Sequence, residues 1–476
     1  MRYCIGNNHL EKYKVRVDDN LNKYRHLIIY CMIIIILIGC ATQMNSDKEM
    51  LLKELEFALK NEFLDVWYPA ALDTVYGGFL SDFTFDWRPE GQQNKMIVTQ
   101  SRQVWTASRA AMFYQDDKYR KIAEHGFKFL KDKMWDKTYG GFYQLRDRQG
   151  NLIPYGDGLH KVAYGNAFAI YALATYYEAF GDTSALDLAR QTFAWLEKYN
   201  HDPQSKGYVD ATNLDGSWIM WHPTGKTNRD ITETVLKDYN SSIHLLEAFT
   251  QLYKVWPDSL VRERLLEMLT LVRDTFVNKK GYLNMYFTRD WQPLSVYDFS
   301  AEPQEADYFF DHVSFGHDVE TAYLLLEAEH ILGKKSYSVT LPVARALVDH
   351  ALENGWDQDN GGLYYQGYYF DGSDTITIFD DTKEWWVQAE ALNAFLLMAK
   401  LFPQDKKYYE AFRKQWEYIQ RYLIDHQHGG WYSKGLDKSP EREKGPKGYD
   451  WKVNYHETRA LINCIQMLKD EHELLK

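Results

Sequence analysis

Six segments in which glycine is followed by aromatic residues recur along the chain, and this repeat constrains the fold more than any other feature. Examples are YGGFYQLRD, which starts at residue 139, and GGWYSKG, which starts at residue 429. Spacing of this kind indicates one supersecondary unit repeated along the chain. The first glycines of the six segments stand 63 to 80 residues apart, at Gly77, Gly140, Gly207, Gly281, Gly361 and Gly429.

The intervals between these segments contain pairs of helical patterns joined by a short turn. In residues 166–202 the first pattern is apolar nearly all round and the second is amphipathic, and later intervals repeat this plan. A helix that is apolar on every side is buried, whereas an amphipathic helix covers it. The sequence therefore predicts an all-α fold, a single (α/α)6 barrel (toroid) over residues 49–476, with short β-hairpins or loops on one face.

Charge and composition narrow the range of partners. The formal net charge of −12 and the pI near 5.7 argue against binding to nucleic acid or to an anionic membrane surface. Aromatic residues make up 16% of the chain, with 15 Trp and 36 Tyr. An excess of aromatic rings suits a cleft that stacks against the flat faces of sugars. A helical core packed with aromatic rings would also explain this excess.

The N-terminal segment carries a targeting pattern. Residues 27–39 form an apolar run that follows basic residues and is too short to span a bilayer comfortably. The run leads into Leu-Ile-Gly-Cys, which resembles the lipoprotein signal of bacteria and makes Cys40 the expected lipidation site. We therefore expect residues 1–39 to be a signal peptide and residues 40–48 a short tether. The protein would be exported and held at a bacterial membrane only through this lipid, on the periplasmic side or at the cell surface. An uncleaved anchor would place it in the same compartment.

Polar and aromatic residues stand at the starts of the apolar helices. A buried helix should not begin with ionisable groups unless they face solvent, a partner or a substrate. Because the inner helices converge on a central cavity, these residues would line its mouth. His244, His317 and His456 occupy places that the repeat makes equivalent, which favours a site over satisfied core histidines. The candidates are Arg102, Tyr164, Asn166, Asn240, His244, His317, Glu320, Trp385, Trp386, Glu390, Trp451 and His456.

A metal centre is one interpretation of three histidines and an acid. No two of the three histidines share the spacing that places two ligands on one helix face. Cys464 is the only cysteine after Cys40, which excludes zinc sites built on cysteine pairs and an intrachain disulfide framework. We expect no metal and no cofactor, and a metal assembled from three separate helices is the less favoured alternative.

A glycoside hydrolase is a second interpretation, because such an enzyme needs two carboxylates across a cleft. Asp318 follows His317 directly and points about 100° away around the helix. Glu320 stands three residues after His317 and shares its face, which suits a carboxylate that orients the imidazole. The candidate acids are Asp318, Glu320, Glu390 and Glu457.

Proton transfer at carbon is the third interpretation. Imidazoles titrate near neutral pH, so two of them can remove a proton from one face of a carbon and return one to the other face. A nearby arginine would stabilise the negative charge that builds on oxygen in an enediolate. Histidines, an arginine and stacking tryptophans around a sugar-sized cavity describe epimerisation of a sugar at C2 without a metal or a nucleotide.

Four blocks of sequence carry a resemblance to a known family. They are IHLLEAFTQLYKVWPD, HVSFGHDVE, EWWVQAEA and WKVNYHETRA, in this order. With these blocks, the span from about residue 50 to residue 472 resembles the N-acylglucosamine 2-epimerase superfamily, and SFGHDVE favours its cellobiose 2-epimerase branch, which acts on disaccharides.

The resemblance implies catalytic roles. His317 and His456 would open the sugar ring and carry the C2 proton, with His244 as the third histidine of the site. Arg102 would stabilise the enediolate, and Glu320 would support His317. Trp386 and Trp451 would stack on the two sugar rings. The full set of expected substrate-binding residues is Tyr164, Asn240, Trp385, Trp386, Glu390 and Trp451.

The sequence also departs from the pattern of that branch. Ser242 stands where a histidine is usual, Val387 replaces a proline, and Asn454 and Glu457 replace a proline and an asparagine. None of these positions transfers a proton, so they bear on the choice of sugar more than on the reaction. The expected function is metal-independent C2 epimerisation of the reducing-end sugar of a β-linked disaccharide or oligosaccharide of the cellobiose or mannobiose type. A glycoside hydrolase and a non-catalytic sugar-binding protein stay open as alternatives.

Overall fold

The computed structural model describes residues 47–156, 158–221, 234–298, 300, 302–333, 338–370 and 373–475. The chain divides into two compact units, Met1–Glu56 and Phe57–Lys476. In the first unit residues 47–56 are described and are helical. The predicted signal peptide and the lipidation site at Cys40 lie outside the described residues. A search of the described part of the chain finds no helix that is long and apolar enough to cross a membrane.

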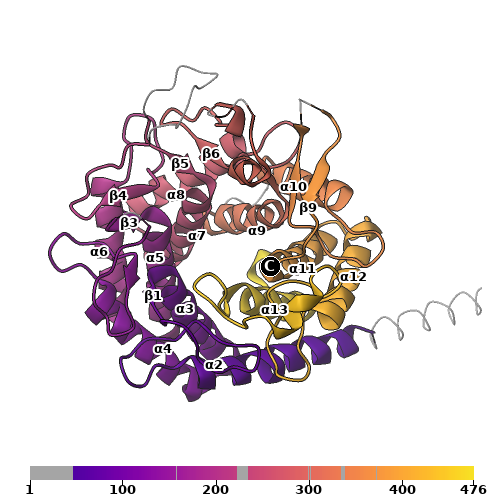
Figure 1. The fold of residues 1–476 in the computed structure, drawn as a ribbon, viewed down its shortest axis with the longest axis horizontal. Helices are drawn as coiled ribbons and strands as arrows, with labels where there is room; N and C mark the ends of the chain where they lie inside the picture. The colour runs from indigo at the N-terminus through magenta and orange to yellow at the C-terminus, as the bar shows by residue number, and fades with distance from the viewer. Residues whose placement is uncertain are drawn as a thin grey trace, which may run out of the picture. The chain divides into compact units, whose positions relative to one another are not determined.

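Six helices form an inner ring within the unit Phe57–Lys476, as far as the structure describes it. Each contacts the next inner helix along the chain, and the last contacts the first, so the ring closes (Figure 1). Each also packs against an outer helix. This arrangement confirms the predicted (α/α)6 barrel. The inner helices are α3 (Ile97–Tyr114), α5 (Ala163–Phe180), α7 (Tyr239–Val255), α9 (Phe315–Ile331), α11 (Trp385–Leu401) and α13 (Tyr455–Leu468).

The outer helices follow the inner ones after short turns. Asp116, Asp182 and Asp258 precede three of them, and each side chain accepts a hydrogen bond from a backbone N–H of the first turn. Such caps let an inner helix end and its outer partner begin within a few residues. The outer elements are η1 (Ala58–Leu64) with α2 (Asp65–Ala71), α4 (Asp117–Phe129) with η2 (Leu130–Met134), α6 (Thr183–Tyr199), α8 (Ser259–Leu271) with η3 (Val272–Phe276), α10 (Thr340–Asn354) and α12 (Lys406–Tyr422).

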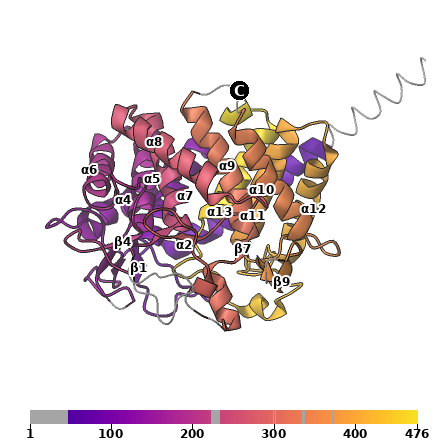
Figure 2. The same ribbon diagram turned by 90° about the horizontal axis from the view of Figure 1, so that it is seen from above.

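Short antiparallel strands gather at the end of the ring where the inner helices begin (Figure 2). In each sheet one strand leads directly into an inner helix, so the strands fix where that helix starts. The pairs are β1 (Lys95–Met96) with β2 (Leu145–Arg146), β3 (His160–Val162) with β4 (Ala211–Asn213), and β5 (Lys237–Asp238) with β6 (Tyr286–Phe287). A three-stranded sheet has the order β7 (Val313–Ser314), β8 (Gln366–Tyr368) and β9 (Thr377–Asp380). Loops carry the 3-10 helices η4 (Val296–Asp298), η5 (Glu305–Phe310), η7 (Pro440–Lys444) and η8 (Glu473–Leu475).

The repeated glycines are required by tight turns that precede these strands. In the second repeat, the Asp136 carboxylate accepts hydrogen bonds from the N–H groups of Thr138 and Tyr139. Gly141 follows with a φ of +73°, where a Cβ atom would lie 2.7 Å from the Trp195 ring. Both the backbone angle and the close approach therefore demand glycine.

A buried lysine pairs with the aspartate of each of five such turns. Four of these lysines stand two residues before an inner helix, and Lys447 stands eight residues before α13. The side chains of both partners are 4% exposed or less. At the matching places the fourth repeat carries Asn278 and Val313, so the acid and the base are lost together. This is what the cost of an unpaired buried charge predicts. The pairs are Lys95–Asp73 (2.9 Å), Lys161–Asp136 (2.7 Å), Lys237–Asp202 (3.3 Å), Lys383–Asp357 (2.7 Å) and Lys447–Asp425 (2.6 Å).

Candidate active site

One residue from each inner helix contributes to a layer inside the barrel. It is the sixth residue of α3, α5, α7, α9 and α11 and the fifth of α13. The Arg102 guanidinium carbon lies 4.5 Å from the ring centre of Phe168, and that ring lies 4.5 Å from the ring of His244. We call this set the inner layer, and its members are Arg102, Phe168, His244, Glu320, Glu390 and Arg459.

The three predicted histidines do not share one level, which corrects the sequence prediction of equivalent places. His244 belongs to the inner layer, whereas His317 is the third residue of α9 and His456 the second of α13. An offset of three to four residues is about one helical turn, or about 5 Å along the axis. At the level of the other two histidines α7 carries Ser241, whose N–H is capped by the Asp238 carboxylate at 2.8 Å.

Arg459 joins carboxylates from three other inner helices. Its Nη2 donates to Glu390 Oε1 at 2.7 Å and to Glu320 Oε1, and its Nη1 donates to Glu247 Oε1. All four side chains are 2% exposed or less. Burial alone would raise the pKa of Glu247, but Arg459 and His244 lower it to about 2. The three carboxylates around the guanidinium of Arg459 therefore form one hydrogen-bonded buried cluster rather than free acids.

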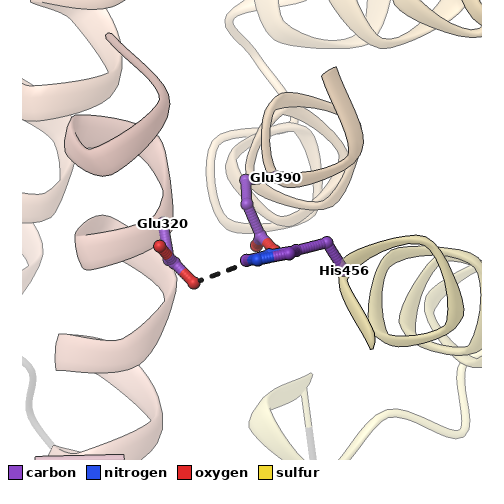
Figure 3. A group of neighbouring side chains, drawn as sticks. All are labelled: Glu320, Glu390 and His456. Carbon is purple, nitrogen blue, oxygen red and sulfur yellow. Dashed lines mark hydrogen bonds and ion pairs between the residues drawn. The ribbon is translucent and has the colours of Figure 1, made fainter. Parts of the chain in front are cut away.

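His456 is oriented by this cluster. Its Nδ1 lies 2.6 Å from Glu390 Oε1 and 3.9 Å from Glu320 Oε1 (Figure 3). Burial lowers the pKa of the imidazole well below 6.5, and Arg102 lowers it further. The ring is therefore neutral near pH 7, and the carboxylate at Nδ1 keeps the proton on that nitrogen. Nε2 is left with a lone pair, as a general base requires.

His317 stands on α9, which α11 separates from α13, and has a different environment. Its ring centre lies 4.7 Å from Tyr239 and 4.6 Å from Trp386, and its Nδ1 has no hydrogen-bond partner among the described residues. Burial lowers the pKa of His317 well below 6.5, and neighbouring histidines, His312 first, lower it further. The side chain is therefore a neutral imidazole, and no carboxylate of the described residues bonds its Nδ1.

Two of the candidate carboxylates have partners in the structure that the sequence did not predict. Glu320 was expected to orient His317 because both share one face of α9, but Arg459 binds Glu320 from across the ring. Glu390 was expected to bind substrate, but it is 0% exposed and bonds His456 and Arg459 instead. Burial raises the pKa of Glu390, against the effect of Arg459.

The tandem tryptophans of α11 point to different surroundings. Trp386 is half-buried, and its ring centre lies 4.6 Å from His317 and 5.8 Å from His456. Trp385 is 4% exposed and packs against Tyr449 and Lys452. Successive residues on a helix point about 100° apart, so Trp385 faces these packing partners and not the histidines beside Trp386.

Arg102, Tyr164 and Trp451 lie together on the other side of the histidines. Arg102 Nη2 donates to the Tyr164 hydroxyl at 2.8 Å, and Nη1 donates to the Trp451 carbonyl at 3.3 Å. The rings of Tyr164 and Trp451 are 5.8 Å apart, and Trp451 is 41% exposed. Burial raises the pKa of Tyr164 to about 12, against the effect of Arg102, so its hydroxyl stays protonated and can donate. The arrangement brings a cation, a hydroxyl and an exposed ring to one place.

His244 and Asn240 complete the predicted set. The His244 ring lies 4.7 Å from the ring of Tyr164 in an edge-on arrangement, and its Nδ1 lies 3.0 Å from Glu247 Oε2. Asn240 is the second residue of α7 and is half-buried, one turn nearer the helix start. Asn166, by contrast, accepts a hydrogen bond from the Phe142 N–H at 2.8 Å and so supports the turn rather than the cavity.

Sequence reasoning missed Glu247, Arg459 and Tyr455. The Tyr455 hydroxyl donates to Glu247 and accepts from Arg459 Nη1 at 2.5 Å. A signal for two of them was present, because an ionisable residue follows each site histidine by three positions, as in His244–Glu247 and His456–Arg459. That spacing places both residues of a pair on one helix face.

Three ligand atoms in the described part of the chain lie close enough to hold a cation. Atoms of Glu320, Glu390 and His456 all lie within 4.8 Å of one another. However, Arg459 Nη2 already bonds both carboxylates, so a metal ion would have to approach or displace a guanidinium cation. His456 Nδ1 also donates to Glu390, whereas a ligating imidazole offers a lone pair. The residues fit an arginine-centred network better than a metal centre.

The two other carboxylates considered for a hydrolase are also bonded to protein groups. Asp318 accepts from the Leu283 N–H at 3.1 Å and lies 3.5 Å from His350 Nδ1, which confirms that it faces away from the site and holds a loop. Glu457 is fully buried and lies 3.4 Å from Lys452 Nζ. Neither is placed as the acid or the nucleophile of a glycosidase pair.

The chain is similar to known proteins over most of its length. A family model described as N-acylglucosamine 2-epimerase matches residues 77–460. A cellobiose 2-epimerase of Ruminococcus albus is 31% identical over 429 residues, which cover 87% of this chain and 98% of that protein. A D-mannose isomerase of Marinomonas mediterranea is 27% identical and covers 85% of this chain and 93% of its own length. The solved structure of a cellobiose 2-epimerase from Spirochaeta thermophila matches with a TM-score of 0.76 at 28% identity, over 90% of this chain and 99% of that one.

Proposed function

Because the chain belongs to the N-acylglucosamine 2-epimerase family, we propose that it inverts C2 of the reducing-end sugar of a β-linked disaccharide or short oligosaccharide. Sugars of the cellobiose or mannobiose type are the substrates that the similarity to cellobiose 2-epimerases favours. The observation that carries the proposal is the pair of neutral imidazoles, His317 and His456, which reach one tryptophan ring from two different helices.

The reaction follows from the chemistry of these groups. Ring opening moves the proton of the C1 hydroxyl to the ring oxygen and gives an aldehyde. One imidazole then removes the C2 proton, the electron pair forms the C1–C2 double bond, and the carbonyl oxygen takes up the negative charge of a cis-enediolate. Arg102 stabilises this oxygen. After rotation about the C2–C3 bond, the other imidazole, which takes up a proton from solvent to form an imidazolium, donates that proton to C2 on the opposite face. The aldehyde then re-forms and the first imidazolium releases its proton to solvent.

The two histidines differ in how strongly their surroundings stabilise the protonated imidazolium. When His456 accepts one at Nε2, the resulting imidazolium lies against Glu390, which stabilises the charge as the aspartate does in a catalytic triad. His317 has no such carboxylate at Nδ1 and returns its proton more readily. We therefore assign the first abstraction to His456 and the reprotonation to His317 for one direction of a reversible reaction.

Aromatic platforms support a substrate of two sugar rings. Trp386 lies beside both histidines and suits the reducing-end ring, whereas the more exposed Trp451 suits the second ring. Tyr164 supplies a hydroxyl group next to Trp451, and Asn240 at the start of α7 supplies an amide as a further hydrogen-bonding group.

Incubation with cellobiose and with β-1,4-mannobiose in deuterated water tests the reaction. We expect the C2 epimer of each, with deuterium at C2, by NMR and chromatography. Release of monosaccharides would contradict the proposal in favour of a hydrolase, and unchanged sugars would contradict it in favour of a binding protein.

A pair of histidine variants separates catalysis from folding. We expect His456→Ala to abolish turnover with the unfolding temperature nearly unchanged. His426→Ala is the matched control, because this histidine lies on the surface, with its side chain 60% exposed. Loss of activity in the control, or full activity in His456→Ala, would overturn the assignment.

An aldose–ketose isomerase is the second candidate, which the similarity to a D-mannose isomerase favours. The same enediolate gives a ketose if the second proton goes to C1 instead of C2. Products of the deuterium experiment distinguish the two, because isomerisation yields a ketose labelled at C1 rather than an aldose labelled at C2.

We also propose that the protein is exported and anchored by a lipid on Cys40, as the Leu-Ile-Gly-Cys pattern after an apolar run indicates. Expression in a bacterium with radiolabelled palmitate tests this. We expect label in the membrane fraction for the parent chain and none for Cys40→Ser, and label in both would contradict the proposal.

A further inference from the structure

A cavity of about 340 Å³ lies beside the β7–β8 pair, outside the group of residues around His317 and His456. Part of its wall comes from the segment between β6 and β7, which carries η4 and η5. Four of its lining residues are tyrosines. The lining residues are Tyr282, Ser295, Tyr297, Asp311, Val313, Tyr368 and Tyr369.

The aromatic walls are fixed by contacts behind them. The rings of Tyr282 and Tyr369 stack, with centres 5.3 Å apart and planes 22° from parallel. The Tyr369 hydroxyl lies 2.9 Å from His350 Nε2. Tyr368 is 6% exposed, and its ring packs against Tyr308 at 4.8 Å. These rings are therefore held in place without a ligand, as a preformed site requires.

Asp311 supplies the charged group on the polar side of the cavity. The Tyr368 hydroxyl lies 3.1 Å from Asp311 Oδ1 and 3.0 Å from Oδ2, which positions the carboxylate. Burial raises the pKa of Asp311, against hydrogen bonds from Ser295 and Tyr368. A carboxylate in this setting accepts hydrogen bonds from a ligand's hydroxyl groups, and the tyrosine and serine hydroxyls can both donate and accept.

We propose that this cavity is a second saccharide-binding site, which holds one or two pyranose units. Its volume lies at the lower end of the range for ligand sites, about 300–1,000 Å³. Rings offer flat apolar faces to the C–H groups of a sugar, and Asp311 with its neighbours offers partners to the hydroxyls. An anionic ligand is disfavoured because the lining has a carboxylate and no basic residue. A cationic ligand is disfavoured because Lys280 already places its ammonium 4.1 Å from the Tyr369 ring centre.

The site is separate from the reaction but lies on the same end of the barrel. Val313 is in its wall and precedes His317 by only four residues, through the strand that leads into α9. No lining residue belongs to the inner layer. The cavity thus holds a saccharide in addition to the one at the histidines, either another part of a long chain or a second molecule. Binding here needs no catalysis, so the inference does not rest on the proposed reaction.

Calorimetric titration of the His456→Ala chain with β-1,4-linked glucotetraose and mannotetraose tests the site. We expect two binding events for at least one of these sugars. Asp311→Asn, made in that chain, should weaken one event about tenfold, the effect of losing one hydrogen bond to a charged group. Tyr297→Ala should weaken the same event about tenfold, because it removes a ring that packs on the sugar together with its hydroxyl. Tyr139→Ala is the matched control, an exposed tyrosine in the turn of the second repeat, and should leave both events unchanged.

The outcomes separate this site from the proposed reaction. A single binding event, or two events that both cavity substitutions leave unchanged, would overturn the inference. Asp311→Asn and Tyr297→Ala in the catalytically intact chain should leave disaccharide turnover unchanged. If the intact chain shows no turnover but the cavity variants still weaken one event, the reaction is wrong and the second site stands.

Discussion

Arg459 shows how the charge on one side chain organises a site on three other helices. Its guanidinium bonds Glu247 on α7, Glu320 on α9 and Glu390 on α11. Carboxylates this deeply buried persist as anions only when a cation and hydrogen bonds compensate for lost water. The position of Glu390, and with it the orientation of the His456 ring, therefore depends on a residue one turn further along α13.

The carboxylate behind His456 gives the first prediction. Glu390→Gln keeps the size of the side chain but removes the charge that stabilises the imidazolium. We expect kcat for cellobiose to fall about 10²-fold, the lower range for a general base, with KM nearly unchanged because the residue is buried behind the ring. Steady-state kinetics measure both. Glu329→Gln is the control, because Glu329 is a buried glutamate of α9 that lies outside the cluster. An equal loss of kcat in this variant would count against a positioning role for Glu390.

The pH dependence of the reaction follows from the two histidines. Burial is the main cause that lowers the pKa of both His317 and His456 well below 6.5, so both are neutral bases above that pH. As pH falls through these lowered values the imidazoles become protonated and proton abstraction stops. We therefore expect the acid limb of kcat/KM to lie below pH 6.5, measured over about pH 4 to pH 8. An acid limb at or above pH 6.5 would contradict the assignment.

Metal removal tests the nature of the Glu320–Glu390–His456 cluster. Since Arg459 occupies the carboxylates, we expect dialysis against a chelator to leave the rate unchanged. If the chelator abolishes the activity and only an added divalent cation restores it, the metal interpretation is correct instead.

At the scale of elements, the buried lysine–aspartate pair explains why the same turn recurs before each helix. Lys161 Nζ donates to Asp136 at 2.7 Å and also to the carbonyl of Leu214 at 3.0 Å, so one ammonium joins two loops to the start of α5. The fourth repeat reaches the same fold with a neutral pair, Asn278 and Val313. The lysine–aspartate pair can therefore be replaced by neutral residues, but only when both members change together.

A double substitution tests this exchange. Lys161→Val alone leaves Asp136 buried without its cation, and we expect the free energy of unfolding to fall by about 3–5 kcal/mol. Adding Asp136→Asn should restore a large part of it, because the pair then matches the fourth repeat. Denaturant unfolding of both variants measures the change. A double variant no more stable than Lys161→Val would show that the residues act independently.

At the scale of the molecule, α13 closes the ring and carries two residues of the site. It contacts both α11 and α3, and it supplies His456 and Arg459. Cys464 lies on the same helix, is 0% exposed, and its thiol lies 3.7 Å from the Leu392 carbonyl of α11. Burial raises the pKa of this thiol far above its usual range. Its reactivity therefore reports whether the ring is closed.

Thiol labelling follows from this closure. In a chain that starts at residue 47, Cys464 is the only cysteine. We expect no labelling by a thiol reagent in native buffer over a time in which the denatured chain reacts completely. Complete native labelling at the denatured rate would contradict a closed ring. A labelled chain that still shows the native helical content would place the opening at α13 alone.

The barrel architecture could be predicted from patterns along the chain. The six glycine segments and the alternation of apolar and amphipathic helices predicted the barrel, because periodicity depends only on neighbours along the chain. The same logic brought His317, His456, Trp386 and Arg102 to the helix starts, where the structure has them.

Which carboxylate orients which imidazole depends on contacts between helices that are far apart in the sequence. Spacing along α9 predicted that Glu320 would orient His317, and it correctly gave the shared helix face. Local spacing, however, cannot say which groups arrive from other helices, and Arg459 on α13 bonds Glu320 while Glu390 on α11 orients His456. The charge of a buried side chain is compensated by whatever lies nearest in space, and in a closed ring that partner comes from across the barrel.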